Sequence, residues 1–319
     1  MWGSRDSMSM DISSPLVPST PQAEAIARLF YVDLIVSGVI LSVVVGLLLT
    51  VILRNRRAKQ GGLPVQDFGN EKLEWAWTLV PLVIVTGLFL YTVRIMHEVD
   101  PKPLNRQPDV EVVAHQWWWE VHYLPSGAIT ANEIHLPVGR DLLFKVRSAD
   151  VVHDFWVPAL GQKVDAFPNH PNYAWYDVER AGTYLGTCAE FCGAEHAWMR
   201  IRVIADPVPA FGSWLEHQLI EARPPSGPAA KMGAHLFERH TCMNCHSIRG
   251  TPADGDVGPD LTHLASRETL AAGVFVNNPE NLLKWIRSPQ TYKPGSHMPN
   301  LNLSAESFEQ ITAYLEELK

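Results

Sequence analysis

Two long apolar runs lie near the start of the chain, and the part beyond residue 100 has the composition of a water-soluble protein. The first run extends from Leu29 to Leu53; as a helix it would be about 37 Å long, enough to cross the hydrocarbon of a bilayer. The second run, Trp75 to Val93, is also about one membrane thick. It begins with Trp75 and Trp77, aromatic residues that favour the membrane interface. The pattern predicts a membrane-spanning helical hairpin.

The segment between the two runs is basic, with Arg54, Arg56, Arg57, Lys59 and Lys72. The positive-inside rule places it in the cytoplasm, so both chain ends are expected on the periplasmic or extracytoplasmic side. The polar, proline-containing first 27 residues do not resemble a cleaved signal peptide. From hydropathy alone, the hairpin could equally be no more than an anchor.

Residues 106 to 206 show the short alternation of apolar and polar side chains that is typical of strands, with turn-forming residues between the stretches. Val121 and Tyr123, for example, alternate with Glu120 and His122. Several such strands predict an antiparallel sandwich or barrel.

Metal-binding side chains gather in the segment CAEFCGAEHAWM, residues 188 to 199. Cys188, Cys192, His196 and Met199 supply soft donors, which favour copper over magnesium or calcium. The second cysteine allows two sulfur atoms to bridge two copper ions, and His153 is the candidate for a further histidine ligand. Strand periodicity after the segment turns Met199 inward. A zinc site or a disulfide is the alternative.

A second cysteine pair lies in CMNCH, residues 242 to 246, the C-x-x-C-H signature of covalent haem attachment. In this motif Cys242 and Cys245 bind the haem, and His246 is the proximal iron ligand. The segment PPSGP, residues 224 to 228, marks a linker after a short helix expected at residues 211 to 222. Ser304 can cap an amphipathic C-terminal helix. A zinc-binding or thioredoxin-like pair is the alternative.

The formal net charge is −8, and the soluble part carries most of it. Nucleic acid is therefore not expected as a partner, because its phosphates require a basic binding face. The acidic surface needs no explanation beyond solubility.

The segments SADVVHDFWVP and CAEFCGAEHAWM resemble subunit II of cytochrome c oxidase, whose soluble domain is a cupredoxin barrel with a binuclear copper A centre. The resemblance implies that Glu190 ligates copper through its backbone carbonyl and that its carboxylate helps bind Mg²⁺ at the contact with subunit I. The full implied ligand set is His153, Cys188, Glu190, Cys192, His196 and Met199.

Two further positions receive roles from this resemblance. The segment HQWWWE resembles the place where electrons enter the family's copper domain, which assigns that role to Trp117; a core tryptophan is the alternative. In LEWAWTLVP, Glu74 matches a carboxyl group that admits protons into subunit I. A charge that favours the helix N-terminus is the alternative for Glu74.

The C-terminal region resembles a class I cytochrome c. This resemblance implies that Met298, in PGSHMPN, is the sixth ligand of the haem iron, with His297 as its rival. It also implies that the carbonyl of Pro259, in GPDL, holds the imidazole of His246.

We therefore expect a multidomain chain with an extracytoplasmic tail (residues 1 to 27), a two-helix transmembrane hairpin (28 to 98), an all-β cupredoxin-like domain (99 to 207), a linker (208 to 228) and an all-α cytochrome c domain (229 to 319). The resemblance implies an enzyme component, subunit II of an oxidase in a bacterial inner membrane. Its implied partners are subunits I and III and a donor such as a cytochrome c or the bc1 complex. Electrons would pass through haem c and copper A to subunit I, where oxygen is reduced and protons are pumped.

A membrane-tethered electron shuttle or copper-delivery protein is the rival interpretation. The pair Glu190 and Glu74 discriminates, because a shuttle needs neither a magnesium ligand nor a carboxyl group at a cytoplasmic helix end. An enzyme similar to nitrous oxide reductase is a weaker rival, because the chain has no histidine-rich catalytic copper domain.

Overall fold

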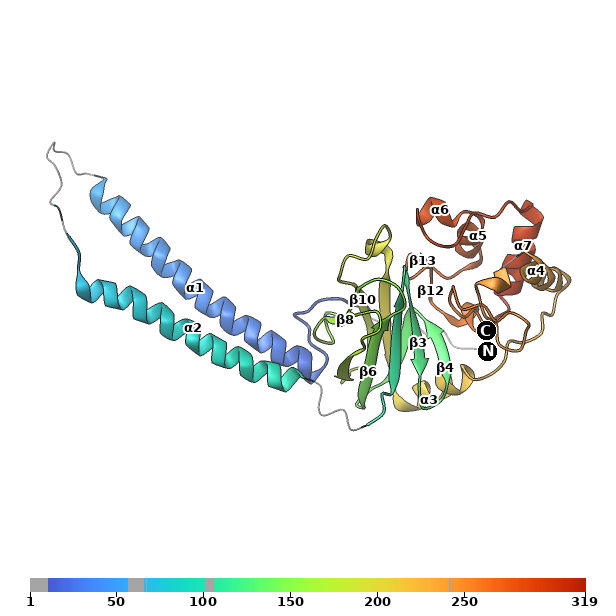
Figure 1. Cartoon of the computed structure of the whole chain (residues 1–319), viewed down its shortest axis with the longest axis horizontal. Helices are drawn as coiled ribbons and strands as arrows, with labels where there is room; N and C mark the ends of the chain where they lie inside the picture. The colour runs from blue at the N-terminus through green and yellow to red at the C-terminus, as the bar shows by residue number, and fades with distance from the viewer. Residues whose placement is uncertain (1–10, 57–65, 67, 101–105, 241) are drawn as a thin grey trace, which may run out of the picture. The chain divides into compact units, whose positions relative to one another are not determined.

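The computed structural model describes residues 11–56, 66, 68–100, 106–240 and 242–319. The chain forms two compact units. One runs from Glu24 to Asp100, and the other comprises the residues up to Ala23 together with Pro101–Lys319. Figure 1 shows the long helices α1 and α2 and the sheets and helices of the second unit. Arg57 and Lys59 of the basic segment lie outside the described residues.

The first unit is a helical hairpin of α1 (Pro21–Asn55) and α2 (Glu71–Val99). Both helices are long and apolar enough to cross a membrane. Both also begin before the apolar runs, because each start is set by a cap. The Thr20 hydroxyl accepts a hydrogen bond from the amide of Ala23, and the Asn70 side chain accepts one from that of Leu73. Hydropathy therefore located the spans but not the helix starts.

Hydroxyl groups along the hairpin bond to backbone carbonyls of their own helix. The hydroxyl of Ser42, for example, donates to the carbonyl of Gly38 at 2.7 Å, because a hydroxyl in hydrocarbon needs a partner within the protein. Where α1 begins and α2 ends, Arg28 on α1 forms an ion pair with Glu98 on α2 at 2.8 Å. This pair ties the two helices together.

Residues 106 to 206, which are predicted to bind copper and are called the copper domain here, form a sandwich of two sheets, which confirms the predicted fold class. One sheet has the order β5-β11-β10-β7-β8 with β1 also beside β10, and the other has the order β4-β3-β2-β6-β9. The strands are β1 (Asp11–Ile12), β2 (Val110–His115), β3 (Trp118–Tyr123), β4 (Ala128–Ala131), β5 (Glu133–Pro137), β6 (Asp141–Ser148), β7 (His153–Trp156), β8 (Val164–Ala166), β9 (Asn172–Asp177), β10 (Gly182–Cys188) and β11 (Arg200–Asp206).

The interior of the sandwich is built from large side chains of both sheets, among them Trp119, Phe144, Phe155 and Tyr184. Three strand pairs are parallel (β1 with β10, β11 with β5, β2 with β6), so the expectation of a purely antiparallel arrangement is wrong at these pairs. Alternation reports which face of a strand is buried, and it carries no information about the direction of the neighbouring strand.

Residues 11 to 20 lie along the copper domain. Ile12 pairs with Tyr184 of β10, and the Thr20 hydroxyl donates to the carbonyl of Leu160 at 2.6 Å. These contacts fix the segment that leads into α1. The short helix expected at residues 211 to 222 is α3 (Val208–His217), which starts earlier because proline favours the first helical turn.

The cytochrome c domain is mainly helical, as predicted, with one two-stranded hairpin that the pattern did not predict. The hairpin is β12 (Thr269–Leu270) and β13 (Phe275–Val276). The Ser304 side chain caps the last helix by accepting from the amide of Ser307 at 3.1 Å, which confirms the predicted cap. The helices are α4 (Pro228–Arg239), α5 (Pro279–Arg287), α6 (Pro289–Tyr292) and α7 (Ala305–Leu315).

Helices α4 and α7 cross closely at Gly233. A Cβ atom at this position would collide with the backbone carbonyl of Gln310 and lie 2.9 Å from the Cβ of Tyr314. Because the obstacle is backbone, a larger residue must push the two helices apart. Gly233 therefore allows the contact that closes the core of the cytochrome c domain.

Gly233→Ala should destabilise the cytochrome c domain by about 1 to 3 kcal/mol through overpacking. Gly212→Ala on α3 is the matched control, because nothing lies within 4 Å of a Cβ added there. Proteolysis of residues 228 to 319 across a urea series measures the difference. Equal urea midpoints for the two variants would contradict this account of the helix crossing.

Candidate functional site

Three loops meet at one end of the copper domain because of the strand directions. β10 ends at Cys188 and β11 returns from Arg200, so the segment between them is a loop at that end. β7 starts at His153 and runs antiparallel to β10, which brings His153 beside Cys188. The turn from β2 to β3 carries Trp117 to the same end. His153 and Cys188 are thus neighbours in space although 35 positions separate them in the sequence.

The sulfur and nitrogen atoms of the predicted ligands converge there. The Sγ atoms of Cys188 and Cys192 lie 3.8 Å apart, without a disulfide between them. His153 Nδ1 is 3.9 Å from the Cys188 sulfur, and His196 Nδ1 is 3.6 Å from the Cys192 sulfur. His153, Cys188 and Cys192 are all buried and arranged as a metal-binding group. A disulfide is therefore not the arrangement that the structure contains.

Two weaker donors complete the cluster. Met199 Sδ lies 4.0 Å from the Sγ of Cys192, and the backbone carbonyl oxygen of Glu190 lies 3.2 Å from the Sγ of Cys188. Met199 is fully buried, as the strand periodicity predicted. The carboxylate of Glu190 is exposed, and so is the neighbouring Phe191 side chain. All six predicted ligands are thus within reach of one small volume.

The two thiols are electrostatically coupled. The hydrogen bond with Cys192 lowers the pKa of Cys188 to about 3, and the same contact raises the pKa of Cys192. This contact favours the thiolate of Cys188, and the thiolate is the form that binds metal.

Asp150 orients the histidine of the cluster. Its carboxylate accepts a hydrogen bond from Nε2 of buried His153 at 2.8 Å, which leaves Nδ1 facing Cys188. Burial alone would raise the pKa of Asp150, but hydrogen bonds from His153 and from the amides of Gln116 and Val151 hold it below its usual range. Asp150 escaped the sequence analysis, although its position three residues before His153 was a usable signal.

Trp117 joins the cluster directly. Its indole N–H donates to the carbonyl of Cys192 at 3.0 Å, and the Gln116 amide donates to the same oxygen at 2.7 Å. The ring packs over Gly193, which has a positive φ of 115° and no room for a side chain. Trp117 is therefore both a buried core residue and a direct neighbour of the sulfur cluster.

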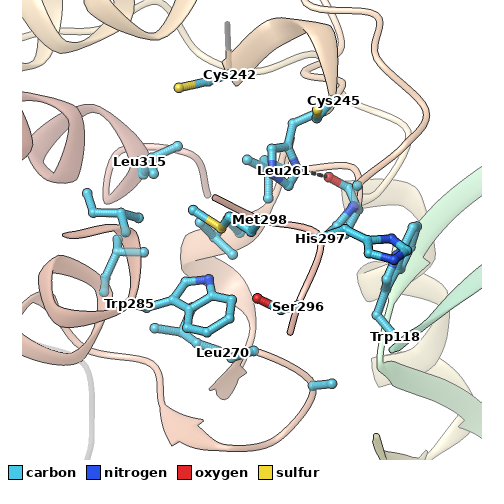
Figure 2. A pocket seen from close by; sticks show the side chains of 18 of the residues that line it. Trp118, Cys242, Cys245, Leu261, Leu270, Trp285, Ser296, His297, Met298 and Leu315 are labelled. Carbon is cyan, nitrogen blue, oxygen red and sulfur yellow. Dashed lines mark hydrogen bonds between the residues drawn. The ribbon is translucent and has the colours of Figure 1, made fainter. Parts of the chain in front are cut away.

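A large cavity opens beside Trp117 within the same compact unit. Figure 2 shows that Cys242, Cys245 and Met298 lie around it, with apolar side chains such as Leu261, Leu270, Trp285 and Leu315 along its walls. A flat, mostly apolar group with two attachment points and two axial donors suits this lining. The cavity thus fits a covalently attached haem.

The imidazole of His246 is held in place by the backbone. Its Nδ1–H donates to the carbonyl of Pro259 at 2.8 Å, which confirms the predicted contact. Burial lowers the pKa of His246, so the ring is neutral and its Nε2 is free to bind a metal.

The rival axial donors point in different directions. Met298 lies in the cavity near the two cysteines, whereas the ring of His297 stands against the copper domain (Figure 2). The centroids of the His297 and Trp117 rings are 5.5 Å apart. The arrangement therefore favours Met298 over His297 as the ligand on the cavity side.

Glu74 lies in the first turn of α2, together with Glu71, and both side chains are exposed. This position agrees with the predicted helix end and does not separate a proton-conducting role from a helix-end charge.

These sites and the fold define a membrane-anchored electron-transfer protein. Residues 12–95 match the transmembrane domain of cytochrome c oxidase subunit II, residues 126–206 match its periplasmic domain, and residues 230–319 match cytochrome c.

Three curated relatives, each called cytochrome c oxidase subunit 2, cover most of the chain. That of Alkalihalophilus pseudofirmus is 35% identical over 95% of this chain and 90% of its own length. Those of Bacillus sp. PS3 and Bacillus subtilis are 33% and 30% identical, over 83% and 84% of this chain and 80% and 81% of their own lengths. The chain belongs to the cytochrome c oxidase subunit II family. It is a component of a membrane-bound oxidase with partner subunits, and its domains point to copper and haem.

Proposed function

We propose that this subunit accepts electrons at a haem c in its C-terminal domain and passes them through a binuclear copper A centre to subunit I, where oxygen is reduced and protons are pumped. The haem and the copper pair supply reversible one-electron chemistry when bound. The chain's own residues supply position, ligands and tuning. A cytochrome c or the bc1 complex is the proposed donor, on the periplasmic side.

One observation carries this proposal. Trp117 lines the haem cavity and also donates a hydrogen bond to the carbonyl of Cys192 within the sulfur cluster. A single side chain therefore bridges the two cofactor sites. A copper-delivery protein would need a copper site accessible to a recipient, and it would have no use for a side chain that joins that site to a haem cavity. An electron shuttle could use the bridge but would need neither a magnesium ligand at Glu190 nor a carboxyl group at Glu74.

The copper ligands proposed are the thiolates of Cys188 and Cys192, His153, His196, Met199 and the carbonyl of Glu190. The spacing of the two sulfur atoms would suit two ions that share both thiolates, and it would also suit one tetrahedral zinc ion. The donor set decides in favour of copper, because six donors that include a thioether exceed the four of a tetrahedral zinc site. Cys242 and Cys245 would attach the haem, with His246 and Met298 as its axial ligands.

The exposed carboxylate of Glu190 would meet subunit I and help hold Mg²⁺ there, as a hard oxygen donor suits a hard cation. Because its own carbonyl belongs to the copper cluster, Glu190 would place that contact next to the point where electrons leave the subunit. Subunit III is a further proposed partner.

Trp117→Phe keeps an aromatic ring but removes the indole N–H, and it should slow electron equilibration between haem and copper by about tenfold, because small displacements at such contacts are costly. Trp118→Phe is the matched comparison, since Trp118 lines the same cavity. Transient absorption after flash reduction measures the rates in the assembled oxidase. A larger effect of Trp118→Phe would move the role to that ring.

Met298→Leu should leave the haem attached through Cys242 and Cys245 but lower its potential by on the order of 100 mV, because axial ligands set haem potentials over a wide range. His297→Gln should leave the potential unchanged. A redox titration of the haem band compares the two. The opposite ranking would make His297 the axial ligand.

Glu74→Gln should reduce oxidase turnover and slow reduction of the oxygen-binding haem in subunit I, and Glu74→Asp should partly restore both, because only Asp retains a titratable proton. Glu71→Gln is the control, since Glu71 shares the first turn of α2 and the same helix-end field. Oxygen consumption and stopped-flow reduction measure these effects. Equal behaviour of Glu74→Gln and Glu71→Gln would reduce Glu74 to a helix-end charge.

A further inference from the structure

The copper domain and the cytochrome c domain share an interface with buried charged side chains, among them Lys293 and Glu133. Lys293 and Glu133 are each only 3% exposed, although lysine and glutamate are rarely buried without well-placed partners. Lys293 belongs to the cytochrome c domain and Glu133 to the copper domain. Their partners show what the burial achieves.

The ammonium of Lys293 is matched to three carbonyl oxygens. Its Nζ lies 3.2 Å from the carbonyl of Trp117, 3.3 Å from that of Trp198 and 3.5 Å from that of Ala271. An ammonium group has three N–H donors, so each donor has an acceptor. Two of the acceptors belong to the copper domain, and one of them, Trp198, directly precedes Met199 of the sulfur cluster.

The Lys293 side chain retains its charge in this position. Burial lowers the pKa of Lys293 to about 8, because the ammonium loses hydration, while the negative charge of Glu195 works against this effect. The ammonium therefore remains the main form at neutral pH. Its hydrogen bonds to carbonyls are charge-assisted, the stronger kind.

Glu133 makes the reciprocal contact from the copper domain. One carboxylate oxygen accepts from the amide of Glu268 at 2.9 Å, and the other accepts from the amide and the hydroxyl of Thr269. Arg202 lies beside Glu133 on the neighbouring strand and forms an ion pair with the Glu268 side chain at 2.9 Å. Two oppositely charged side chains on the paired strands β5 and β11, Glu133 and Arg202, thus bind the chain where β12 begins.

We infer that Lys293 and Glu133 are positioning residues that hold the cytochrome c domain on the face of the copper domain around Trp117, so that the chain's own domain occupies this face. Any other docking of the two surfaces would bury the ammonium or the carboxylate without these partners, which is costly, so the two contacts favour one docked arrangement over alternative ones. The ring contact between His297 and Trp117 follows from the same arrangement.

This inference rests on the proposed function for its purpose, but its first test does not depend on either cofactor. Hydrogen exchange of the backbone amides of Glu268 and Thr269, followed by mass spectrometry in the assembled oxidase, reports directly on their bonds to Glu133. Lys293→Met keeps the length of the side chain without its donors. In Glu133→Gln, either orientation of the amide places an NH₂ group against a backbone N–H.

Both variants should speed exchange in residues 268 to 273 by about tenfold or more, because hydrogen bonds to charged groups are among the stronger ones. Lys284→Met and Glu280→Gln are the matched controls; they break an exposed ion pair on α5 and should leave this exchange unchanged. The copper and haem spectra should be the same in all four variants, while haem-to-copper transfer slows only in the first two.

Unchanged exchange in residues 268 to 273 in both Lys293→Met and Glu133→Gln would overturn the inference. A response of the exchange with no electron transfer between haem and copper, even in the unaltered chain, would instead overturn the proposed function and leave the docked interface standing.

Discussion

The meeting of two buried thiols at the end of the β-sandwich is the constraint on which the rest of the structure depends. Cys188 and Cys192 lie 3.8 Å apart in a place from which water is excluded. A thiolate in such a place is unfavourable unless donors or cations surround it. His153 and His196 each bring a ring nitrogen to one of the two sulfur atoms, and Asp150 holds His153 in the required orientation.

The second unit is organised outward from this cluster. The carbonyl of Cys192 accepts a hydrogen bond from the indole of Trp117, and the carbonyl of Trp117 accepts one from the ammonium of Lys293. Met298, which lines the haem cavity, follows Lys293 closely in the chain. Each contact uses a backbone oxygen, so the route from cavity to cluster depends on loop conformation as much as on side-chain identity. The membrane hairpin contributes differently, by anchoring the chain in the membrane.

Much of this could be predicted from the sequence, because the decisive residues are chemically rare. Two cysteines, a histidine and a methionine within twelve residues have few uses, and C-x-x-C-H has fewer. Apolar runs identified the spans, and alternation identified the sandwich. Parallel strand pairs escaped prediction, since period-two alternation does not encode a neighbour's direction.

The interface residues escaped prediction for another reason. Lys293 and Glu133 are common residue types, and along a sequence they look like ordinary surface charges. Only the arrangement of the domains shows that the three donors of Lys293 meet three carbonyls. Asp150 lies between these cases, because its place beside His153 was visible but its hydrogen bond was not.

The central claim is the order of electron flow through one chain, from haem to copper and then to subunit I. Flash reduction of the haem in the fully oxidised complex, followed at the separate absorption bands of haem c, copper and the haem of subunit I, tests it most directly. The account predicts that copper is reduced at the rate at which haem c is oxidised, and that copper is reoxidised as the haem of subunit I is reduced. Reduction of the haem in subunit I in step with oxidation of haem c, with no transient change at copper, would contradict it.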